Sequence, residues 1–465
     1  MTLGKRERHE VIVMSLSTLA TEPIEALLPL ASDETLVPLL DGRWVRYANL
    51  DGAASAPALA SVAARIAEVT PWYSSVHRGA GYLSQVSTAL YEEARRTIAA
   101  FVGARESDVA VITRNTTDAV NLLASAVPGR TLVLDVEHHA NLLPWQRSPH
   151  GVTVVTGEAT VTGTLARLEA ELVGRPHALV ALTGASNVTG ESLPIDRVVA
   201  LAHEHGARVF VDGAQLLPHR RFSLASTDVD YVAFSGHKLY APYGAGALVG
   251  RRDWLDEAPA YLAGGGSVQR VTVQEATWSP APARHEGGTP NLLGALAIAS
   301  ACEALTALDP VVWEEHEQAL RQRLVAGLAE IPEVTIATLW EDSAPPVGVV
   351  TFTVEGADAG LVATYLSAEH GIGVRDGKFC AHPLVTRLGL VEGALRASVG
   401  LGTGSEDVDR LLAGLRAFLA ARAAGELEQR YRLADGLWGL AEDPRPLPRI
   451  AGLAELARTA SSCRG

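Results

Sequence analysis

Cysteine and methionine are scarce in this chain of 465 residues. It has three cysteines, Cys302, Cys380 and Cys463, and two methionines. So small and odd a set of cysteines excludes a framework of disulfides and a cysteine-rich zinc site. Sparse cysteine is also typical of proteins from a reducing compartment, so we expect a cytoplasmic protein without a bound metal.

The chain also lacks an excess of positive charge. Lysine and arginine total 39 against 53 acidic residues, which gives a formal net charge of −14. This balance excludes a general binder of nucleic acid or anionic membranes, because those ligands require basic surfaces. No apolar run reaches the roughly 20 residues of a membrane span. The N-terminal run "VIVMSLSTLA" is broken by serine and threonine, so we expect no secretory signal.

Short apolar runs instead alternate with helix-like segments through the middle of the chain. The runs are "VAVIT" (109–113), "TLVLDVE" (131–137), "ALVALTGAS" (178–186), "RVFVDGAQ" (208–215) and "DYVAFSGHK" (230–238). Apolar strands that alternate with amphipathic helices predict an α/β fold, with a mainly parallel sheet between two layers of helices. We interpret the small-residue stretch "GAGALVG", which follows the last run, as tight turns.

A chain of this length is too long for one core, so we expect more than one domain. We divide it into an N-terminal extension (1–35), a large domain (36–307), a small α+β domain (308–425) and a tail (426–465). The segment 36–60 is expected to pack with the small domain. The sequence of the tail predicts two short helices, and we assign no function to it.

Polar side chains follow the apolar runs at the points where the predicted strands end. Ligands of parallel α/β sheets bind beyond these carboxyl ends, so we expect the polar residues to form one site. They are Thr116, Thr117, His138, Asn187, Asp212, Gln215 and Lys238.

Several longer stretches occur in an order that resembles a known family. They are "RYANLDGAASAP" (46–57), "SVHRGAGYLS" (75–84), "VITRNTTDAVNLLA" (111–124), "VEHHANLLPWQ" (136–146), "SNVTGESLPI" (186–195), "VDGAQLLPH" (211–219), "FSGHKLYAPYGAGALVGR" (234–251), "HEGGTPN" (285–291), "GIGVRDGKFCAHPL" (371–384) and "RASVG" (396–400). Together they resemble the class V branch of the pyridoxal phosphate (PLP) aminotransferases, and most closely its cysteine desulfurases and selenocysteine lyases. The resemblance implies a fold-type I PLP enzyme with a mainly parallel seven-stranded sheet and a smaller C-terminal domain.

The resemblance implies roles for two charged residues. Lys238, in "SGHK", would bind the aldehyde of PLP covalently and carry a proton at the substrate α-carbon, which requires a neutral amine. Asp212, in "VDGAQ", would pair with the pyridine nitrogen and keep the ring an electron sink. On the residues alone, a loop lysine is the ordinary interpretation of Lys238, and Asp212 could instead cap the next helix.

Other residues would contact the ring of the cofactor. Gln215 and Asn187 would donate hydrogen bonds to its phenolic oxygen, although Asn187 also suits a plain turn. His138 would stack on the ring and act in acid–base catalysis. The sequence alone does not decide between His138 and its neighbour His139.

The phosphate of the cofactor needs an anion site. Thr116 and Thr117 lie at a predicted helix N-terminus, where free N–H groups and hydroxyls favour an anion, or where a threonine simply caps the helix. The resemblance adds Ser235 and His237 to this site. It also implies that Thr289 reaches the phosphate of a partner subunit, and therefore a homodimer.

Three residues are assigned to the substrate, which the resemblance implies is an amino acid, L-cysteine. Arg396 would hold its carboxylate with the planar fork of the guanidinium, unless it is a salt-bridged strand arginine. Arg375 is a second candidate for the carboxylate. His77, in "SVHRGAGYLS", is placed on the same side.

Cys380 decides which reaction is expected. In the desulfurases the equivalent thiolate attacks the sulfur of L-cysteine, forms a persulfide, releases alanine and passes the sulfur to an acceptor protein. The alternative is an inert, buried cysteine. Cys302 lies in an apolar helix and Cys463 in the tail, so neither is assigned a role.

The chain departs from the desulfurases near the substrate. Gly81, Lys378 and Phe379 stand where those enzymes often have histidines. Another PLP reaction therefore stays open, such as a C–S β-lyase, selenocysteine lyase, epimerase or aminotransferase. A scaffold without turnover is disfavoured by the complete set of cofactor residues.

Overall fold

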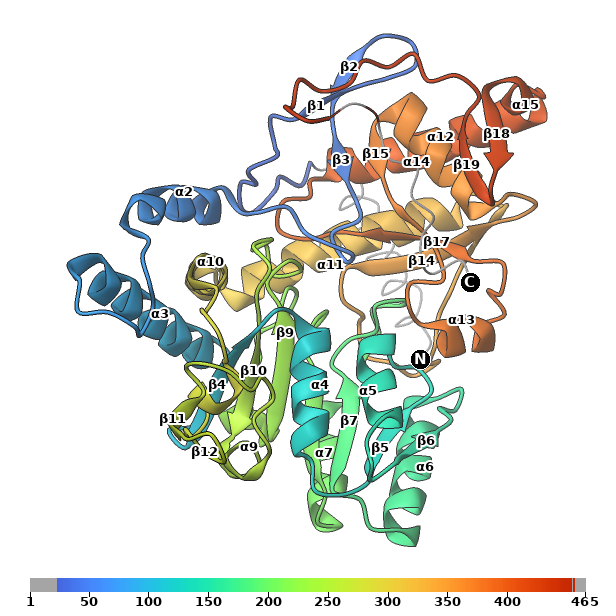
Figure 1. Ribbon diagram of the computed structural model, residues 1–465. Coiled ribbons are helices and arrows are strands. Elements are labelled where there is room, and N and C mark those ends of the chain that lie inside the picture. The colour runs from blue at the N-terminus through green and yellow to red at the C-terminus, as the bar shows by residue number, and fades with distance from the viewer. Residues whose placement is uncertain (1–22, 454, 456–465) are drawn as a thin grey trace, which may run out of the picture.

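The computed structural model describes residues 23–453 and 455, and its centre is a sheet of seven strands in the order β4-β10-β9-β8-β7-β5-β6 (Figure 1). Strands β5 to β9 run parallel, whereas β10 is antiparallel to both of its neighbours. The mainly parallel seven-stranded sheet is therefore confirmed. The strands are β4 (Asp108–Thr113), β5 (Thr131–Leu134), β6 (Val152–Val155), β7 (Leu179–Thr183), β8 (Arg208–Asp212), β9 (Tyr231–Ser235) and β10 (Gly246–Arg251).

Helices cover both faces of this sheet, as predicted. Successive residues of a strand point to opposite faces, so Val209 and Val211 of β8 enter one hydrophobic core and Phe210 the other. The first core is completed by α6 (Val161–Gly174), α7 (Ile195–Glu204) and α10 (Leu292–Ala307). The second is completed by α4 (Thr116–Ala126), α5 (Leu143–Gln146) and α9 (Arg252–Glu257).

Strand β10 corrects the interpretation of "GAGALVG" as tight turns. Residues 246–251 form a buried strand between β4 and β9. A Cβ on Gly246 would lie 2.6 Å from the carbonyl oxygen of Phe234 and 2.7 Å from the Cα of Asn115. Glycine is needed for this close approach, and its lack of a side chain hides the strand in the sequence.

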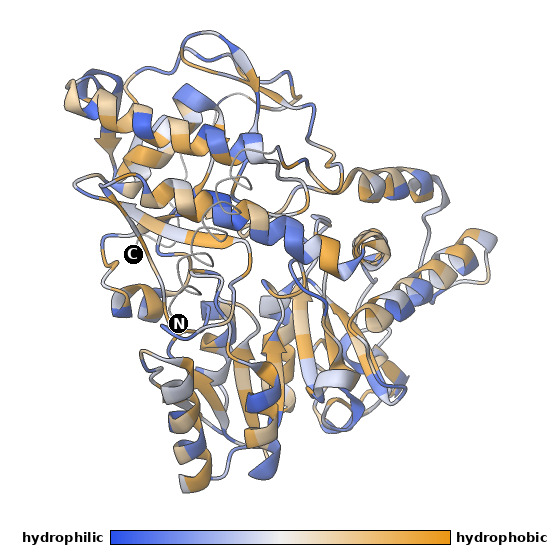
Figure 2. Ribbon diagram, turned by 180° about the vertical axis from the view of Figure 1, so that it is seen from behind, coloured by the Kyte–Doolittle hydropathy of each residue, from blue (hydrophilic) through white to orange (hydrophobic). Residues whose placement is uncertain are grey.

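Helices α2 (Ala60–Val69) and α3 (Tyr82–Phe101) pack against α10, with the 3₁₀ turn η1 (Thr70–Trp72) between them. In Figure 1, α3 lies at the margin of the molecule, away from the C-terminal part. Figure 2 shows that the strands of the central sheet are mainly hydrophobic, whereas outer helices carry both kinds of residue.

The C-terminal part contains a four-stranded antiparallel sheet in the order β13-β14-β17-β16. Its strands are β13 (Val334–Ile336), β14 (Val349–Val354), β16 (Arg375–Gly377) and β17 (Ala394–Ser398). A separate core joins it to α11 (Pro310–Ala329), α12 (Ala359–His370) and α14 (Ser405–Ala423). The short helix α13 (His382–Arg387) follows the turn after β16.

The N-terminal segment crosses to this C-terminal part. Strand β3 (Ala48–Asn49) pairs in parallel with β15 (Ile372–Gly373), and β1 (Leu36–Pro38) pairs with β2 (Trp44–Arg46). The domain limits drawn above stay a prediction. Most of the predicted extension 1–35 and Cys463 lie outside the described residues.

The tail differs from the sequence expectation. As far as residue 453, it has one short helix, α15 (Leu427–Arg430), followed by the hairpin of β18 (Tyr431–Ala434) and β19 (Leu437–Leu440). The turn residues Asp435 and Gly436 both have positive φ, the geometry that an Asp-Gly hairpin turn needs. The hairpin packs on α12.

Smaller elements complete the described chain. They are η2 (His139–Asn141), α8 (Leu224–Thr227), β11 (Val268–Val271), β12 (Ala276–Trp278) and η3 (Ala283–His285). Within the described residues, no single helix has the length and hydrophobicity to cross a membrane. Helices α10 and α11 reach that length and hydrophobicity only when they are taken together, and the chain bends by 93° between them. The same residues contain no group of His, Cys, Asp and Glu arranged to hold a metal ion.

Candidate active site

A cavity of about 220 Å³ lies where the strands of the large sheet end and the C-terminal part begins. Such a position is typical of ligand sites in parallel sheets. Most of the predicted site residues line it, and the exceptions are His77 and Thr289. Those in the lining are Thr116, Thr117, His138, Asn187, Asp212, Gln215, Ser235, His237, Lys238, Arg375, Cys380 and Arg396.

Lys238 lies in the turn after β9. The backbone N–H of Gly236 donates to the carbonyl of Ala245 at 2.8 Å, which holds this turn against β10. Burial lowers the pKa of the Lys238 amine to about 8, although the carboxylate of Asp212 opposes this effect. A lysine with such a pKa is neutral in a useful fraction of molecules near neutral pH, so it can act as a nucleophile.

Asp212 is the last residue of β8 and is buried. Its Oδ1 accepts a hydrogen bond from Ala214 N at 3.0 Å. Burial raises the pKa of this carboxyl, while the Ala214 N–H and the charge of Lys238 lower it. The net shift is upward, so a further positive group in the cavity would favour the charged carboxylate that burial disfavours.

Glu137 is a buried carboxyl that the sequence analysis missed. It accepts from Asn141 Nδ2 at 2.6 Å and from Thr183 N at 3.0 Å, and so ties the turn after β5 to the end of β7. Burial raises its pKa to about 8. Its position directly before His138 means that it helps to set the path of that turn.

The structure distinguishes His138 from His139. His138 lines the cavity, and its Nδ1 accepts from Ala140 N at 3.0 Å, which places the proton of the neutral ring on Nε2. Burial, with a contribution from Lys238, lowers the pKa of His138 to about 3. His139 instead packs its ring 4.6 Å from that of His382.

One end of the cavity suits an anion. Helix α4 begins at Thr116, and Asn115 caps it by accepting from Asp118 N. Ser235 Oγ accepts from Thr116 N at 2.8 Å and lies 2.7 Å from Thr116 Oγ1. The positive end of the dipole of this 11-residue helix, with the hydroxyls of Thr116 and Ser235 beside it, forms an environment that favours a phosphate.

The two amides already have backbone partners. Asn187 Nδ2 donates to Phe379 O at 2.7 Å, and Gln215 Nε2 donates to Ala53 O at 2.6 Å. Each amide nitrogen carries two hydrogens, so one remains for a ligand in the cavity. Their predicted contact with the cofactor stays a prediction.

Arg396 on β17 is buried beside the same cavity. Its Nη1 donates to Asn187 O at 2.8 Å, and its Nη2 lies 3.3 Å from Asp51 Oδ1. Its Nε is buried and has no hydrogen-bond partner among the described residues. Burial lowers the pKa of Arg396, while Asp51 opposes this effect. An orphaned donor on a buried cation is a ready site for a carboxylate.

Cys380 lies in the turn between β16 and α13. Both Phe379 and Cys380 have φ of +53°, which is unusual for residues other than glycine and costs of the order of 1 to 3 kcal/mol each. The carbonyl of Cys380 accepts from His139 N at 2.8 Å. The thiol is half-buried and lines the cavity with Lys238 and Arg396.

His77 and Thr289 lie elsewhere. His77 Nε2 lies 2.9 Å from Glu92 Oε1 and lines a second hollow of about 570 Å³. Thr289 is exposed between Gly288 and Pro290, which line the same hollow. Within this chain, neither residue reaches the cavity of Lys238, so both assignments stay predictions.

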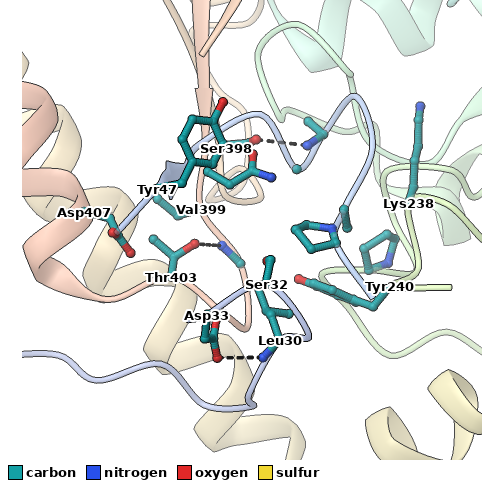
Figure 3. A pocket seen from close by; sticks show the side chains of 18 of the residues that line it. Leu30, Ser32, Asp33, Tyr47, Lys238, Tyr240, Ser398, Val399, Thr403 and Asp407 are labelled. Carbon is teal, nitrogen blue, oxygen red and sulfur yellow. Dashed lines mark hydrogen bonds between the residues drawn. The ribbon is translucent and has the colours of Figure 1, made fainter. Parts of the chain in front are cut away.

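A small cavity of about 50 Å³ lies beside the N-terminal segment (Figure 3). Lys238 stands at its margin, with its amine directed away from Asp33 and Asp407. The cavity has room for a few water molecules only. The larger cavity is therefore the candidate active site.

Comparisons with known proteins show the family of this chain. Residues 48–411 match the family model Aminotransferase class-V. A probable cysteine desulfurase of Vibrio cholerae is 36% identical over 352 residues, which cover 74% of this chain and 86% of that protein. A cysteine desulfurase of Pectobacterium atrosepticum is 35% identical over 408 residues, covering 85% and 97%.

Solved structures show the same relationship. An apo cysteine desulfurase of Thermococcus onnurineus has a TM-score of 0.75 at 30% identity, covering 85% of this chain and all of that one. A cysteine desulfurase of Escherichia coli, in an S-sulfonic acid form, has a TM-score of 0.71 at 32% identity, covering 80% and 95%. The chain therefore belongs to the class V aminotransferase family, among its cysteine desulfurase-like members.

Proposed function

We propose that the protein is a PLP-dependent cysteine desulfurase that converts L-cysteine into L-alanine and a persulfide on Cys380. The observation that carries the proposal is the shared cavity of Lys238, Arg396 and Cys380. It combines an amine for the cofactor, a cation for the substrate carboxylate and a thiol for the sulfur. The relatives named cysteine desulfurase support the same chemistry.

The residues present fit PLP. The amine of Lys238 would hold its aldehyde, the N-terminus of α4 with Thr116 and Thr117 its phosphate, and Asp212 its pyridine nitrogen. The buried carboxylate and the lysine of lowered pKa are the chemistry that such a cofactor requires. Bound there, PLP supplies an electron sink for negative charge at the substrate α-carbon.

The protein side chains would orient the substrate and move its protons. Arg396 would receive the carboxylate at its unpartnered Nε, with Arg375 as a second cation at the same cavity. Lys238, once its amine is released, would move the proton at the α-carbon. His138, which is held neutral, would stack on the cofactor ring and assist proton transfer.

Cys380 would take the sulfur in a balanced step. Its thiolate attacks the substrate sulfur, an S–S bond forms, and the bond between that sulfur and the substrate β-carbon breaks. The electron pair of the broken bond stays with the β-carbon, which takes up the proton that the Cys380 thiol gave up. L-cysteine and a thiol thus yield L-alanine and a persulfide without an outside oxidant or reductant.

Further parts of the proposal concern partners. An acceptor protein would take the persulfide sulfur, and a second copy of this chain would lend Thr289 to the phosphate site. Exposed apolar side chains near the start of α3, such as Trp72 and Tyr82, suit a contact between two copies. A cytoplasmic location suits a reaction that needs a reduced Cys380.

The test is the fate of L-cysteine with the purified holoenzyme. Wild type should form alanine, and sulfide once a thiol reductant is added, whereas Cys380→Ser should form neither. Cys302→Ala, in the core helix α10, is the matched control and should retain activity. If Cys380→Ser is unimpaired, or wild type forms pyruvate or nothing, the proposal is wrong, and one of the other PLP reactions applies.

A further inference from the structure

Phe379, directly before Cys380, has no role in the proposed reaction, but its contacts indicate one. Its side chain is buried, with 4% of its surface exposed. Its ring centroid lies 5.2 Å from the Cζ of Arg396, and its carbonyl oxygen accepts from Asn187 Nδ2 at 2.7 Å. This residue therefore contacts both the candidate carboxylate site and the end of the large sheet.

These contacts tie the Cys380 turn to the large sheet at two consecutive residues. Asn187, which follows β7, holds the carbonyl of Phe379, and His139, which follows β5, holds the carbonyl of Cys380. The turn itself follows β16 of the small sheet. It thus spans from one sheet to the other across the cavity, and its conformation sets where the thiol lies.

The conformation needs such contacts. Phe379 and Cys380 both have φ of +53°, a region that L-residues with bulky side chains avoid. Residues persist there only when their surroundings hold them. At 5.2 Å, the Phe379 ring is within the range at which an arginine is attracted to an aromatic face. The ring is therefore well placed to hold the turn against Arg396.

We propose that Phe379 is a positioning residue that fixes the Cys380 thiol relative to Arg396, and so relative to a substrate whose carboxylate Arg396 holds. The inference deepens the proposed function, because it rests on Cys380 as the sulfur acceptor. The nucleophile and the carboxylate site are then joined through one aromatic ring. Small misplacements of a reacting atom have large effects on rate. The ring of Phe379 would therefore affect the rate of sulfur transfer to Cys380.

The test compares variants of the holoenzyme by two measurements. The first is the rate at which iodoacetamide alkylates Cys380, followed by mass spectrometry of its peptide. The second is the separation of kcat from KM for alanine formation from L-cysteine. The variants are Phe379→Ala, Phe379→Leu and Phe379→Tyr. Phe222→Ala is the control, because Phe222 is a partly buried side chain that packs on the large core outside the cavity lining.

Removal of the ring should loosen the turn. We expect Phe379→Ala to alkylate at least about tenfold faster at Cys380 and to lose roughly 10- to 100-fold in kcat, with KM changed by less than about threefold. Phe379→Leu, which keeps bulk without an aromatic face, should fall between Ala and wild type. Phe379→Tyr should restore both values, and Phe222→Ala should resemble wild type.

Other results would overturn the inference. If Phe379→Leu matches wild type in both measurements, contact between the ring and Arg396 does not position the thiol, and this comparison stands even if Phe379→Ala fails to fold. A raised KM with unchanged kcat would show that the ring serves only the carboxylate site. If wild type forms no persulfide, the proposed function fails instead, while the alkylation rates still decide whether Phe379 holds the turn.

Discussion

Two ionisable residues show how burial sets the chemistry at the scale of single side chains. Desolvation moves the pKa of Lys238 down to about 8 and that of Glu137 up to about 8. Both shifts disfavour the charged form, as expected for groups removed from water. Their functions differ, because Lys238 lines the cavity, whereas Glu137 is closed off by Asn141 and Thr183.

The pKa of Lys238 can be measured through its reaction with PLP. Only the neutral amine attacks an aldehyde, so covalent loading of the apoprotein should accelerate with pH through a midpoint near 8. Asp212 raises the pKa of Lys238, so Asp212→Asn should move the midpoint to lower pH. The measurement is the loading rate, followed by absorbance, across pH. A midpoint near that of an exposed lysine, about 10, would contradict the burial of this amine.

Glu137 should make the protein less stable as pH rises. Its pKa is raised in the folded state, so its contribution to stability is complete below the unfolded pKa of 4.5 and is lost as pH rises through about 8. Glu137→Gln does not ionise and should lack this loss, which the shift from 4.5 to about 8 puts at roughly 5 kcal/mol. The measurement is urea unfolding between about pH 4 and about pH 9, which lie on either side of the unfolded and folded pKa values of Glu137. The exposed variant Glu204→Gln should keep the wild-type slope.

At the scale of elements, β10 shows that a strand outside the cavity lining can still fix the position of a helix that lines the cavity. Gly246 passes so close to Asn115 that a Cβ would lie 2.7 Å from its Cα. Asn115 caps α4, whose first turn is the proposed phosphate site. The packing of one buried strand therefore bears directly on cofactor binding.

Gly246→Ala should damage both stability and cofactor retention. The added methyl group meets backbone atoms, which cannot rotate away, so we expect a loss of about 1 to 3 kcal/mol and weaker PLP binding. Gly174→Ala is the matched control, since a Cβ there meets nothing within 4 Å. Urea unfolding and PLP titration give the two values. Equal behaviour of the two variants would show that β10 tolerates a side chain.

At the scale of the whole molecule, the two sheets meet at the cavity, and α3 lies at the far margin (Figure 1). Trp72, Tyr73, Tyr82 and Leu83 are exposed near the start of α3. The hollow beside His77 lies along the same helix, because it includes Glu92 and Arg95 of α3. This margin is therefore the surface that we propose for the contact between two copies.

The proposed dimer can be tested by introducing a charged side chain into that surface. Tyr82 is 73% exposed, so Tyr82→Glu should not disturb the fold of one chain, but it should oppose apolar association. We expect wild type to be a dimer by light scattering, and the variant to shift to monomer and lose PLP more readily. Val173→Glu, at a position on α6 that is 68% exposed, should stay dimeric. A monomeric wild type would contradict the proposal.

The fold was largely predictable because its strands are buried on both faces. The centres of such strands are then continuously apolar, as in "VFV" (209–211) of β8, and the polar residues at their ends mark the candidate site. Strand β10 was missed because glycine carries no hydrophobic signal. The hairpin of the tail was missed although its Asp-Gly turn was readable in the sequence.

The gathering of most candidate residues in one cavity was predictable from the strand ends, but His77 and Thr289 lie elsewhere and the contacts of the others were not predictable. No local pattern indicates that Asp51 lies beside Arg396, since 345 positions separate them. The positive φ of Phe379 and Cys380 depends on tertiary contacts, as these residue types disfavour it. The choice between His138 and His139 likewise required the path of the backbone.

The proposed reaction requires that Cys380 receives sulfur from L-cysteine. The most direct measurement is a single turnover of the holoenzyme without reductant, with mass spectrometry of the Cys380 peptide and quantification of alanine. This peptide should gain the mass of one sulfur atom, in amounts equal to the alanine formed. Alanine formation without that gain on Cys380, or a gain on another cysteine, would contradict the proposed reaction.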